Sequence, residues 1–375
     1  MNFEKITSYL NSLEEEGIPS VDCMIYKDHK PVYRHFNGYA DSAKAKKMQG
    51  NELYLMFSAT KLITMAAALQ LMEKGKIELD QPVSTYLPAY ADLKVIEEDQ
   101  IRPAGKELLV KHLLSMQSGL DYDLQRSGIV RVLREKGQNA TTQEIVNAFI
   151  ESPLKFEPGE HFEYSLSHDV VGAIIEVASG MSLKEYFTQN IFVPLEMKDT
   201  FFAKPMNKND RLTTQYMYDN DRHVSTEMEP SCCYQLSESY ESGGAGLISC
   251  VEDYGKFADT LASGGVSAKG IRILKEETIE LMRTNLLGSV QREELVKKMG
   301  RVGYGYGCGV QVLLDPKECQ AKAPSGVFGW DGAAGACIIM DPDNRIALVY
   351  AQHVRGCGYA YSTIHPMLRD LLYME

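Results

Sequence analysis

The sequence predicts an α+β fold in which one antiparallel sheet, flanked by helices, is built from both ends of the chain. Strand-like stretches occur at residues 21–36 and return between residues 309 and 352, whereas residues 76–230 have mostly helical patterns. Because the helical stretch separates the strands, we expect a mainly helical lobe inserted into a sheet-containing lobe. The predicted sheet lobe comprises residues 1–75 and 231–375, and the active site is expected at its interface with the helical lobe.

The N-terminal part predicts a hairpin followed by a buried helix. Residues 21–27 (VDCMIYK) and 31–36 (PVYRHF) flank a short polar turn, a pattern typical of two paired strands. Residues 57–74 predict one helix, and Gly75 stands where a C-terminal cap is expected. The middle of that helix, LITMAAALQLM, is apolar on nearly every face, so we expect it to be buried between layers.

The rest of the chain predicts four helices, then strands, then a terminal helix. The predicted helices are 111–116, 142–150, 167–179, 183–192 and 361–373, and the predicted strands are 309–314, 336–340 and 345–352. The last two strands are joined by residues 341–344 (DPDN), a strong turn signal.

Composition excludes several classes of protein. The chain has 375 residues, of which 44% are hydrophobic, and its net charge of -12 argues against nucleic acid or an anionic membrane as the main partner. No stretch approaches the roughly 20 apolar residues of a membrane span, and the N-terminus has no signal-peptide pattern. The cysteines include no C-x-x-C and the histidines no H-E-x-x-H. We therefore expect reduced thiols in a cytoplasm, no metal and no cofactor, and we leave the oligomeric state open.

Residues 57–61 (FSATK) carry the strongest chemical signal. Residues three apart share one helical face, so Lys61 can reach the hydroxyl oxygen of Ser58. Burial disfavours the ammonium form and lowers the pKa of a lysine, which makes Lys61 a candidate base for a Ser58 nucleophile. A chain of this length contains roughly one S-x-x-K by chance. A second S-x-x-K does occur, at residues 152–155, but nearby prolines predict a loop there.

Two further segments can complete a site. Residues 164–169 (YSLSHD) open a helix, and Tyr164 can pass a proton if a lysine lies beside its hydroxyl, although most of the 21 tyrosines must be packing residues. His168 is expected to be structural. Residues 329–335 (GWDGAAG) precede a predicted strand, and their small side chains permit close approach of a ligand to the backbone.

In this order and at these separations, the three segments resemble the motifs of the serine β-lactamase and penicillin-binding-protein superfamily, which are S-x-x-K, Y-x-N or S-x-N, and K-T-G or a variant. Four other stretches are similar to its esterase-like branch: 113–120 (LLSMQSGL), 192–200 (FVPLEMKDT), 243–249 (GGAGLIS) and 303–307 (GYGYG). The resemblance extends from about residue 20 to residue 365 and implies a β-lactamase/transpeptidase-like fold.

Two departures from the lactamase pattern bear on the substrate. Leu166 stands where lactamases carry an asparagine that holds the acyl amide, and Trp330 stands where they carry a lysine that meets the substrate carboxylate. A W-x-G third motif is similar to that of family VIII carboxylesterases and related acyltransferases, which implies an ester or a similar small-molecule acyl substrate. β-Lactamase activity, D-amino-acid peptidase or D,D-carboxypeptidase-like activity, acyl transfer and a non-catalytic binding role remain alternatives.

The resemblance also implies a role for each residue of the site. Ser58 would form an acyl-enzyme, with Lys61 and Tyr164 sharing the proton transfers and Tyr164 protonating the leaving alkoxide. Which of these two side chains is the ground-state base is left open. The backbone N–H groups of Ser58 and Ala333 would form the oxyanion hole. The expected substrate contacts are Trp330, Gly332 and Tyr122.

Overall fold

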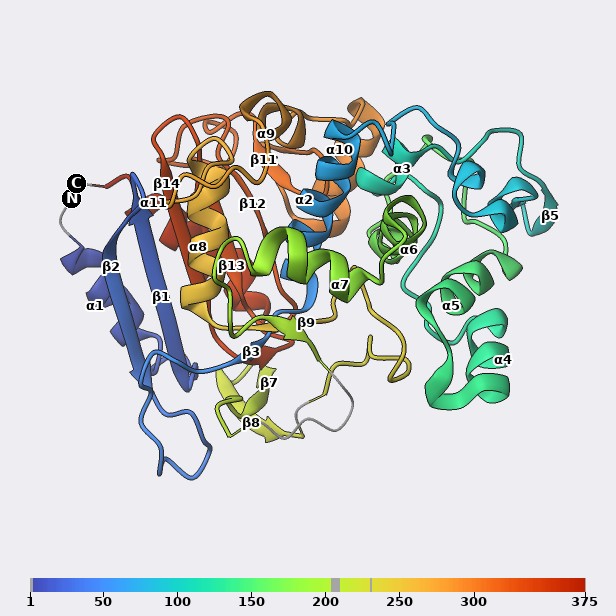
Figure 1. Ribbon diagram of the computed structural model, residues 1–375. Helices are drawn as coiled ribbons and strands as arrows, with labels where there is room; N and C mark the ends of the chain where they lie inside the picture. The colour runs from blue at the N-terminus through green and yellow to red at the C-terminus, as the bar shows by residue number, and fades with distance from the viewer. Residues whose placement is uncertain (1–2, 204–209, 230, 375) are drawn as a thin grey trace.

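A seven-stranded antiparallel sheet forms the centre of the computed structural model, which describes residues 3–203, 210–229 and 231–374 (Figure 1). The strand order is β10-β11-β12-β13-β14-β1-β2. The bounds are β1 (Ser20–Lys27), β2 (Lys30–Gly38), β10 (Tyr304–Tyr306), β11 (Gln311–Leu313), β12 (Phe328–Asp331), β13 (Cys337–Asp341) and β14 (Ile346–Ala351). Cys23 of β1 lies opposite Tyr350 of β14, so the two ends of the chain meet in one sheet. The predicted antiparallel sheet built from both ends is confirmed.

Local sequence explains the turns that close the hairpins at the two ends. Asp28 and His29 have φ angles of 48° and 64°, the left-handed conformation that a tight hairpin turn requires at both central positions. In the turn between β13 and β14, the backbone N–H of Asn344 donates to Asp341 Oδ1 at 3.1 Å. Both turns lie where the sequence predicts them.

Helices cover both faces of the sheet. Their bounds are α1 (Glu4–Ser12), α2 (Thr60–Glu73), α3 (Val110–Leu114), α4 (Ser127–Lys136), α5 (Thr142–Ala148), α6 (Ser167–Ser179), α7 (Leu183–Phe187), α8 (Val251–Ala262), α9 (Glu276–Met282), α10 (Ser289–Met299) and α11 (His365–Leu371). Cys23 and Ile25 of β1 belong to the apolar cluster that includes α1 and α11, whereas Met24 and Tyr26 face α8 (Figure 1). Alternate residues of one strand therefore pack against different helical layers.

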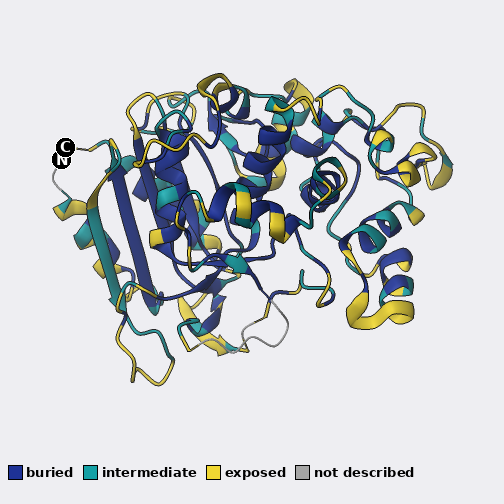
Figure 2. Cartoon of the chain, in the orientation of Figure 1, coloured by how far each residue is buried: buried dark blue, intermediate teal, exposed yellow. Residues whose placement is uncertain are grey.

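Helix α2 is buried along nearly its whole length. All residues from Thr60 to Leu71 are buried, and the helix packs against α6, α7 and strand β12. A 3-10 turn, Phe57–Ala59, precedes it, so the segment predicted as one helix from residue 57 begins with a tighter turn. The burial view shows dark blue over the central strands and yellow on the outer surface of α4 (Figure 2). None of the helices in the described ranges is long and apolar enough to cross a membrane.

Several elements differ from the sequence-based prediction. The predicted helices 183–192 and 361–373 contain π-helical turns, Thr188–Phe192 and Ala360–Ile364, next to α7 and α11. Residues 329–335 precede a strand as predicted, since β13 begins at Cys337, but Trp330 itself lies inside a further strand, β12, that was not predicted. Short strands also occur where none was predicted. They are β3 (Tyr54–Leu55), β4 (Lys94–Glu97), β5 (Gln100–Pro103), β6 (Phe201–Phe202), β7 (Gln215–Asp219), β8 (Val224–Met228), β9 (Leu247–Ser249) and β15 (Val354–Arg355).

Candidate active site

Ser58 lies in the short 3-10 turn that leads into α2. The residue before it, Phe57, is fully buried and has a φ of 45°, an uncommon conformation for a side chain of this size. Strained backbone of this kind persists only where the surroundings fix it. Here the carbonyl of Ala59 accepts a hydrogen bond from the Tyr254 hydroxyl of α8, which anchors the turn to the layer beside it. The serine is thus held in a fixed place at the head of a buried helix.

Lys61 lies in the first turn of α2 and is completely buried. Its Nζ is 3.2 Å from Ser58 Oγ, 2.8 Å from the Tyr122 hydroxyl and 2.7 Å from the carbonyl oxygen of Gly244. Burial lowers the pKa of Lys61 to about 7, although the nearby Asp169 acts in the opposite direction. A lysine with this pKa is available as the neutral amine near neutral pH.

The partners of Lys61 determine which way its lone pair can face. A carbonyl oxygen only accepts hydrogen bonds, so one N–H of the neutral amine is committed to Gly244. A hydroxyl can donate or accept, and Ser58 can therefore direct its O–H to the lysine nitrogen. This is the arrangement of a nucleophile and its base.

Tyr164 stands on the other side of the same pair. Its hydroxyl accepts a hydrogen bond from Trp330 Nε1 at 2.9 Å and is also hydrogen-bonded to Ser58. Lys61 Nζ lies 4.8 Å from the centre of the Tyr164 ring. Burial raises the pKa of Tyr164 above its ordinary value, against the opposing effect of the hydrogen bonds with Ser58 and Trp330. The neutral phenol is thus the stable form and a proton donor.

The turn after β12 brings the backbone N–H group of Ala333 to the same cleft as that of Ser58. Gly332 N–H donates to Ala336 O at 2.8 Å, which closes a tight turn over residues 332–336. A Cβ atom on Gly332 would lie 2.3 Å from the Met56 carbonyl oxygen, so only glycine permits the turn to approach the Ser58 segment this closely. Within the described residues, the backbone N–H groups of Ser58 and Ala333 form no hydrogen bond. Both residues line the cleft and have a free donor.

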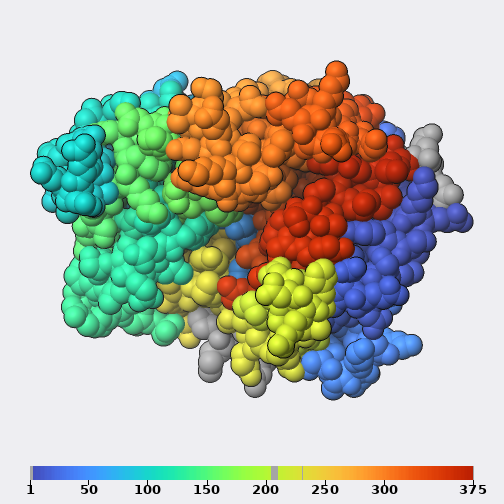
Figure 3. Space-filling model, turned by 180° about the vertical axis from the view of Figure 1, so that it is seen from behind, coloured from blue at the N-terminus to red at the C-terminus, as the bar shows by residue number. Residues whose placement is uncertain are grey.

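The cleft beside Ser58 has a volume of about 310 Å³. It is lined by Ser58, Tyr164, Lys298, Met299, Arg301, Trp330, Asp331, Gly332, Ala333 and Tyr361. The rear view shows a hollow where green, orange and red segments meet (Figure 3). Two cations reach this wall, but Lys298 pairs with Glu163 at 2.6 Å and Arg301 pairs with Asp331. The remaining wall is largely aromatic and apolar.

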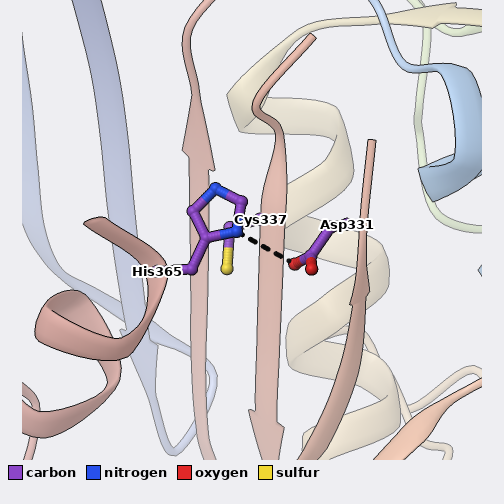
Figure 4. Close-up of side chains that lie close together, drawn as sticks. All are labelled: Asp331, Cys337 and His365. Atoms are coloured by element: carbon purple, nitrogen blue, oxygen red, sulfur yellow. Dashed lines mark ion pairs between the residues drawn. The ribbon is translucent and has the colours of Figure 1, made fainter. Parts of the chain in front are cut away.

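Asp331, the residue after Trp330, belongs to a buried cluster with Cys337 and His365, in which the donor atoms lie within 4.8 Å of one another (Figure 4). Burial alone would raise the pKa of Asp331, but Arg301 and His365 outweigh it and hold that pKa well below its ordinary value. His365 Nδ1 is 3.2 Å from Asp331 Oδ1. Because the Arg301 guanidinium already balances the carboxylate, we interpret the cluster as an ion-pair network that fixes the end of β12.

Other residues singled out in the sequence lie in different surroundings. Tyr122 was expected to line the substrate cleft, but its hydroxyl instead bonds Lys61, and its ring packs 5.5 Å from that of Tyr164. Leu166 is buried in the core. Burial lowers the pKa of His168 well below its ordinary value, as expected of a structural histidine. In the second S-x-x-K, Lys155 is half exposed and pairs with acidic side chains.

Sequence reasoning missed several contributors to the site, among them Gly244 and Arg301. Gly244, a partner of Lys61, lies in the quoted segment 243–249, which had no assigned role. Arg301, which lines the cleft, lies just before the glycine-rich stretch 303–307. Neither residue type carries a local signal, because a backbone carbonyl is common to every residue and an arginine is usually at the surface.

The amino-acid sequence matches the family model described as Beta-lactamase over residues 7–356. Among curated relatives, Esterase EstB from Burkholderia gladioli is 26% identical over 357 residues, which are 88% of this chain and 84% of that protein. Acyltransferase mokF from Monascus pilosus is 26% identical over 305 residues, which are 76% of this chain and 72% of that protein.

Solved structures share the fold over the whole chain. EstCE1, described as a hydrolase with promiscuous acyltransferase activity, aligns with a TM-score of 0.80 at 25% identity and covers 99% of this chain and 98% of its own. Simvastatin synthase LovD from Aspergillus terreus aligns with a TM-score of 0.81 at 19% identity and covers 100% of this chain and 98% of its own. The predicted β-lactamase/transpeptidase-like fold is confirmed, and the chain belongs to the beta-lactamase family.

Proposed function

We propose that this protein is a serine hydrolase that cleaves carboxylic esters or related acyl groups through a Ser58 acyl-enzyme. The observation that carries the proposal is the 3.2 Å contact between Ser58 Oγ and the buried Lys61 Nζ, whose pKa burial lowers to about 7. Tyr164, hydrogen-bonded to Ser58, supplies a second group for proton transfer. Relatives named as an esterase and an acyltransferase support the same chemistry.

In the proposed acylation step, neutral Lys61 accepts the Ser58 proton while Oγ attacks the carbonyl carbon of the acyl group. The carbonyl oxygen becomes an anion, which the N–H groups of Ser58 and Ala333 bind; such a donor contributes about 3–4 kcal/mol in known hydrolases. Tyr164 then donates its proton to the leaving alkoxide as the C–O bond breaks, and Lys61 returns a proton to Tyr164. This assigns the ground-state base to Lys61, because its neutral form exists near pH 7, whereas burial disfavours the Tyr164 phenolate.

Release of the acyl group uses the same residues in reverse. A water molecule gives a proton to the catalytic pair as it attacks the acyl carbonyl, and Ser58 leaves with its proton restored. An alcohol or amine in place of water makes the reaction an acyl transfer. The two outcomes share the first half of the mechanism and differ only in the acceptor.

The cleft wall favours an uncharged ester over a β-lactam carboxylate. Trp330 occupies the position of the lactamase lysine, and the cations Lys298 and Arg301 are both paired with carboxylates. The site thus offers a substrate carboxylate no free partner among the described cleft residues. On this basis we propose that the chain acts like the family VIII carboxylesterases that its sequence resembles.

A reducing compartment also fits the chain. All eight cysteines are free thiols. Cys23, Cys308 and Cys337 are buried, and burial raises the pKa of each of these thiols. We propose a cytoplasmic location on this ground.

The nucleophile assignment is tested with a short-chain p-nitrophenyl ester and a fluorophosphonate probe. We expect Ser58→Ala to lose labelling and to lose turnover by at least roughly 10³-fold. Ser152→Ala, in the second S-x-x-K, is the matched control and should keep activity within about twofold. Labelling that survives in Ser58→Ala would overturn the proposal.

Two comparisons rank the remaining activities. Nitrocefin and the p-nitrophenyl ester, assayed side by side, separate a lactamase from an esterase, and we expect the ester to be preferred. Adding an alcohol acceptor and quantifying free acid against new ester separates a hydrolase from an acyltransferase. A D-alanyl-D-alanine peptide turned over faster than the ester would favour the peptidase alternative.

A further inference from the structure

Asp169 is a buried carboxylate to which the proposed mechanism gives no role. It lies in the first turn of α6 and is 1% exposed. Its Oδ1 accepts hydrogen bonds from the Tyr240 hydroxyl at 2.8 Å, Ser242 Oγ at 2.6 Å and the Gly244 N–H at 3.3 Å. Its Oδ2 is buried and has no hydrogen-bond partner among the described residues. A buried carboxylate oxygen that lacks a hydrogen-bond donor costs free energy, so this arrangement needs an explanation.

The segment that Asp169 holds is the one that contacts Lys61. Gly244 donates its N–H to Asp169 and accepts from Lys61 Nζ through its carbonyl oxygen at 2.7 Å. One residue earlier, the Gly243 carbonyl accepts from Thr64 Oγ1 at 2.6 Å. The two glycines are therefore clamped between α2 and α6, and one peptide segment links the carboxylate to the lysine.

The close packing at this point requires glycine. A Cβ atom on Gly244 would lie 2.5 Å from Asp169 Oδ2 and 3.5 Å from Lys61 Nζ. The unpartnered carboxylate oxygen of Asp169 thus packs against the backbone of Gly244, next to the lysine amine. Ser242 tightens the same turn, because its Oγ also accepts from the Ala245 N–H at 3.0 Å.

We propose that Asp169 is a positioning residue for Lys61, acting through the backbone of residues 242–244 and through its negative charge. This inference rests on the proposed role of Lys61 as the base for Ser58. The clamp fixes the Gly244 carbonyl, which commits one N–H of Lys61 and leaves the lone pair facing Ser58. The charge keeps the amine basic enough to take a proton, despite its burial.

The other titratable groups around Lys61 do not supply this charge. Burial raises the pKa of Tyr122 and of Tyr164, so both side chains stay neutral near neutral pH. Burial, and secondarily the charge of Lys61, lower the pKa of His168 well below its ordinary value, so that ring is neutral too. Asp169 is the anion that raises the pKa of Lys61.

The test is the pH dependence of kcat/KM for a neutral p-nitrophenyl ester with Asp169→Asn. The amide keeps the shape and an acceptor oxygen but removes the charge. We expect the acidic limb, which reports deprotonation of Lys61, to have a midpoint near 7 in the native protein and to move down by about one unit in Asp169→Asn. We also expect the rate on the plateau to fall about tenfold, because a less basic amine is a weaker general base.

Two further variants separate charge from structure. Glu176→Gln changes another partly buried carboxylate on α6, two turns away, and should leave the midpoint unchanged. Ser242→Ala loosens the clamp but keeps the carboxylate, so it should lower the rate without moving the midpoint. If Asp169→Asn fails to fold, Ser242→Ala still tests whether the hydrogen bonds that hold residues 242–244 matter for the rate. In that case, a rate of Ser242→Ala within twofold of the native rate would contradict the inference.

An unmoved midpoint in folded Asp169→Asn would overturn the positioning role. Failure of the proposed function looks different, because the fluorophosphonate probe would then fail to label Ser58 in the native protein. Labelling at Ser58 with an unmoved midpoint in Asp169→Asn rejects this inference alone.

Discussion

At the scale of a single residue, the burial that lowers the pKa of Lys61 and makes it a candidate base also destabilises the folded protein. Its pKa of about 7 in the folded protein lies below the ordinary value of 10.5. Between these two pH values the unfolded chain binds more protons than the folded one, so the stability of the protein rises with pH across this window. Below about pH 7 both states carry the proton, and the full cost of burying an ammonium is present.

This conflict predicts that Lys61→Met stabilises the protein while it abolishes turnover. We expect its melting temperature to exceed the native value by several degrees at pH 6, at roughly 2–4 °C per kcal/mol, and by less at pH 9.5. Thermal unfolding followed by circular dichroism at both pH values provides the measurement. Lys155→Met, at the half-exposed lysine of the second S-x-x-K, should shift neither quantity. If the melting temperature of the native protein, relative to that of Lys61→Met, were lower at pH 9.5 than at pH 6, the assigned pKa would be contradicted.

Trp330 supports Tyr164 through one hydrogen bond as well as through packing. Trp330→Phe removes the Nε1 donor, which lies 2.9 Å from the Tyr164 hydroxyl, and keeps an aromatic ring in the wall. A hydrogen bond of this kind is worth about 1 kcal/mol, so we expect kcat to fall roughly fivefold while KM for a small ester changes less. Steady-state kinetics, which give kcat and KM separately, would show whether kcat falls more than KM changes.

A matched aromatic variant controls for packing. Tyr306 packs edge-on against Trp330 at 5.0 Å, and its buried hydroxyl has no partner among the described residues. Tyr306→Phe should therefore keep kcat and leave the melting temperature equal or higher. If both variants lose kcat equally, disturbed packing rather than the hydrogen bond explains the loss.

At the scale of elements, the contact between the turn after β12 and the segment before α2 forms the proposed oxyanion site. Gly332→Ala would place a methyl group 2.3 Å from the Met56 carbonyl oxygen and force the two segments apart. We expect kcat to fall by about 10²-fold, the range for loss of one oxyanion donor, with a lower melting temperature. Gly105→Ala, where the new Cβ meets only the Glu157 side chain at 3.4 Å, is the control and should change neither. Unchanged kcat in folded Gly332→Ala would exclude this turn from the site.

Elements with a strong periodic or turn pattern were predictable, and those set by tertiary contacts were not. Helix α6 begins and ends at the predicted residues, because Gly180 stops it in the left-handed conformation. The π-helical turn before α11 and the placement of Trp330 inside β12 depend on pairing and packing with distant segments. The same division holds for the site: Ser58 and Lys61 are close in sequence, whereas the Lys61–Gly244 contact joins residues 183 positions apart.

At the scale of the molecule, the core is continuous across the predicted boundary between lobes. One apolar cluster contains Leu62 of α2, Val146 of α5, Val170 of α6 and Ile338 of β13. Strands from the two ends of the chain also lie next to each other in the sheet, since β1 lies between β14 and β2. A core shared in this way couples the stability of the helical part to that of the sheet, and the lobes themselves remain a prediction.

This continuity predicts that the helical part and the sheet unfold together. Cys23 is a buried thiol in β1, and Val146→Cys places a thiol of similar size in α5. In a background with the other cysteines replaced, each thiol should become reactive to a labelling reagent at the same urea concentration. Val146 belongs to the common core, whereas Cys23 lies in a second apolar cluster that shares strands β1, β13 and β14 with that core, so neither part is expected to open alone. The exposed Cys233, kept in a separate variant, controls for the reagent and should react in the absence of urea. Labelling of Val146→Cys at clearly lower urea than Cys23 would show that the helical part opens on its own, and would place the boundary between independently stable units at the cleft that contains Ser58.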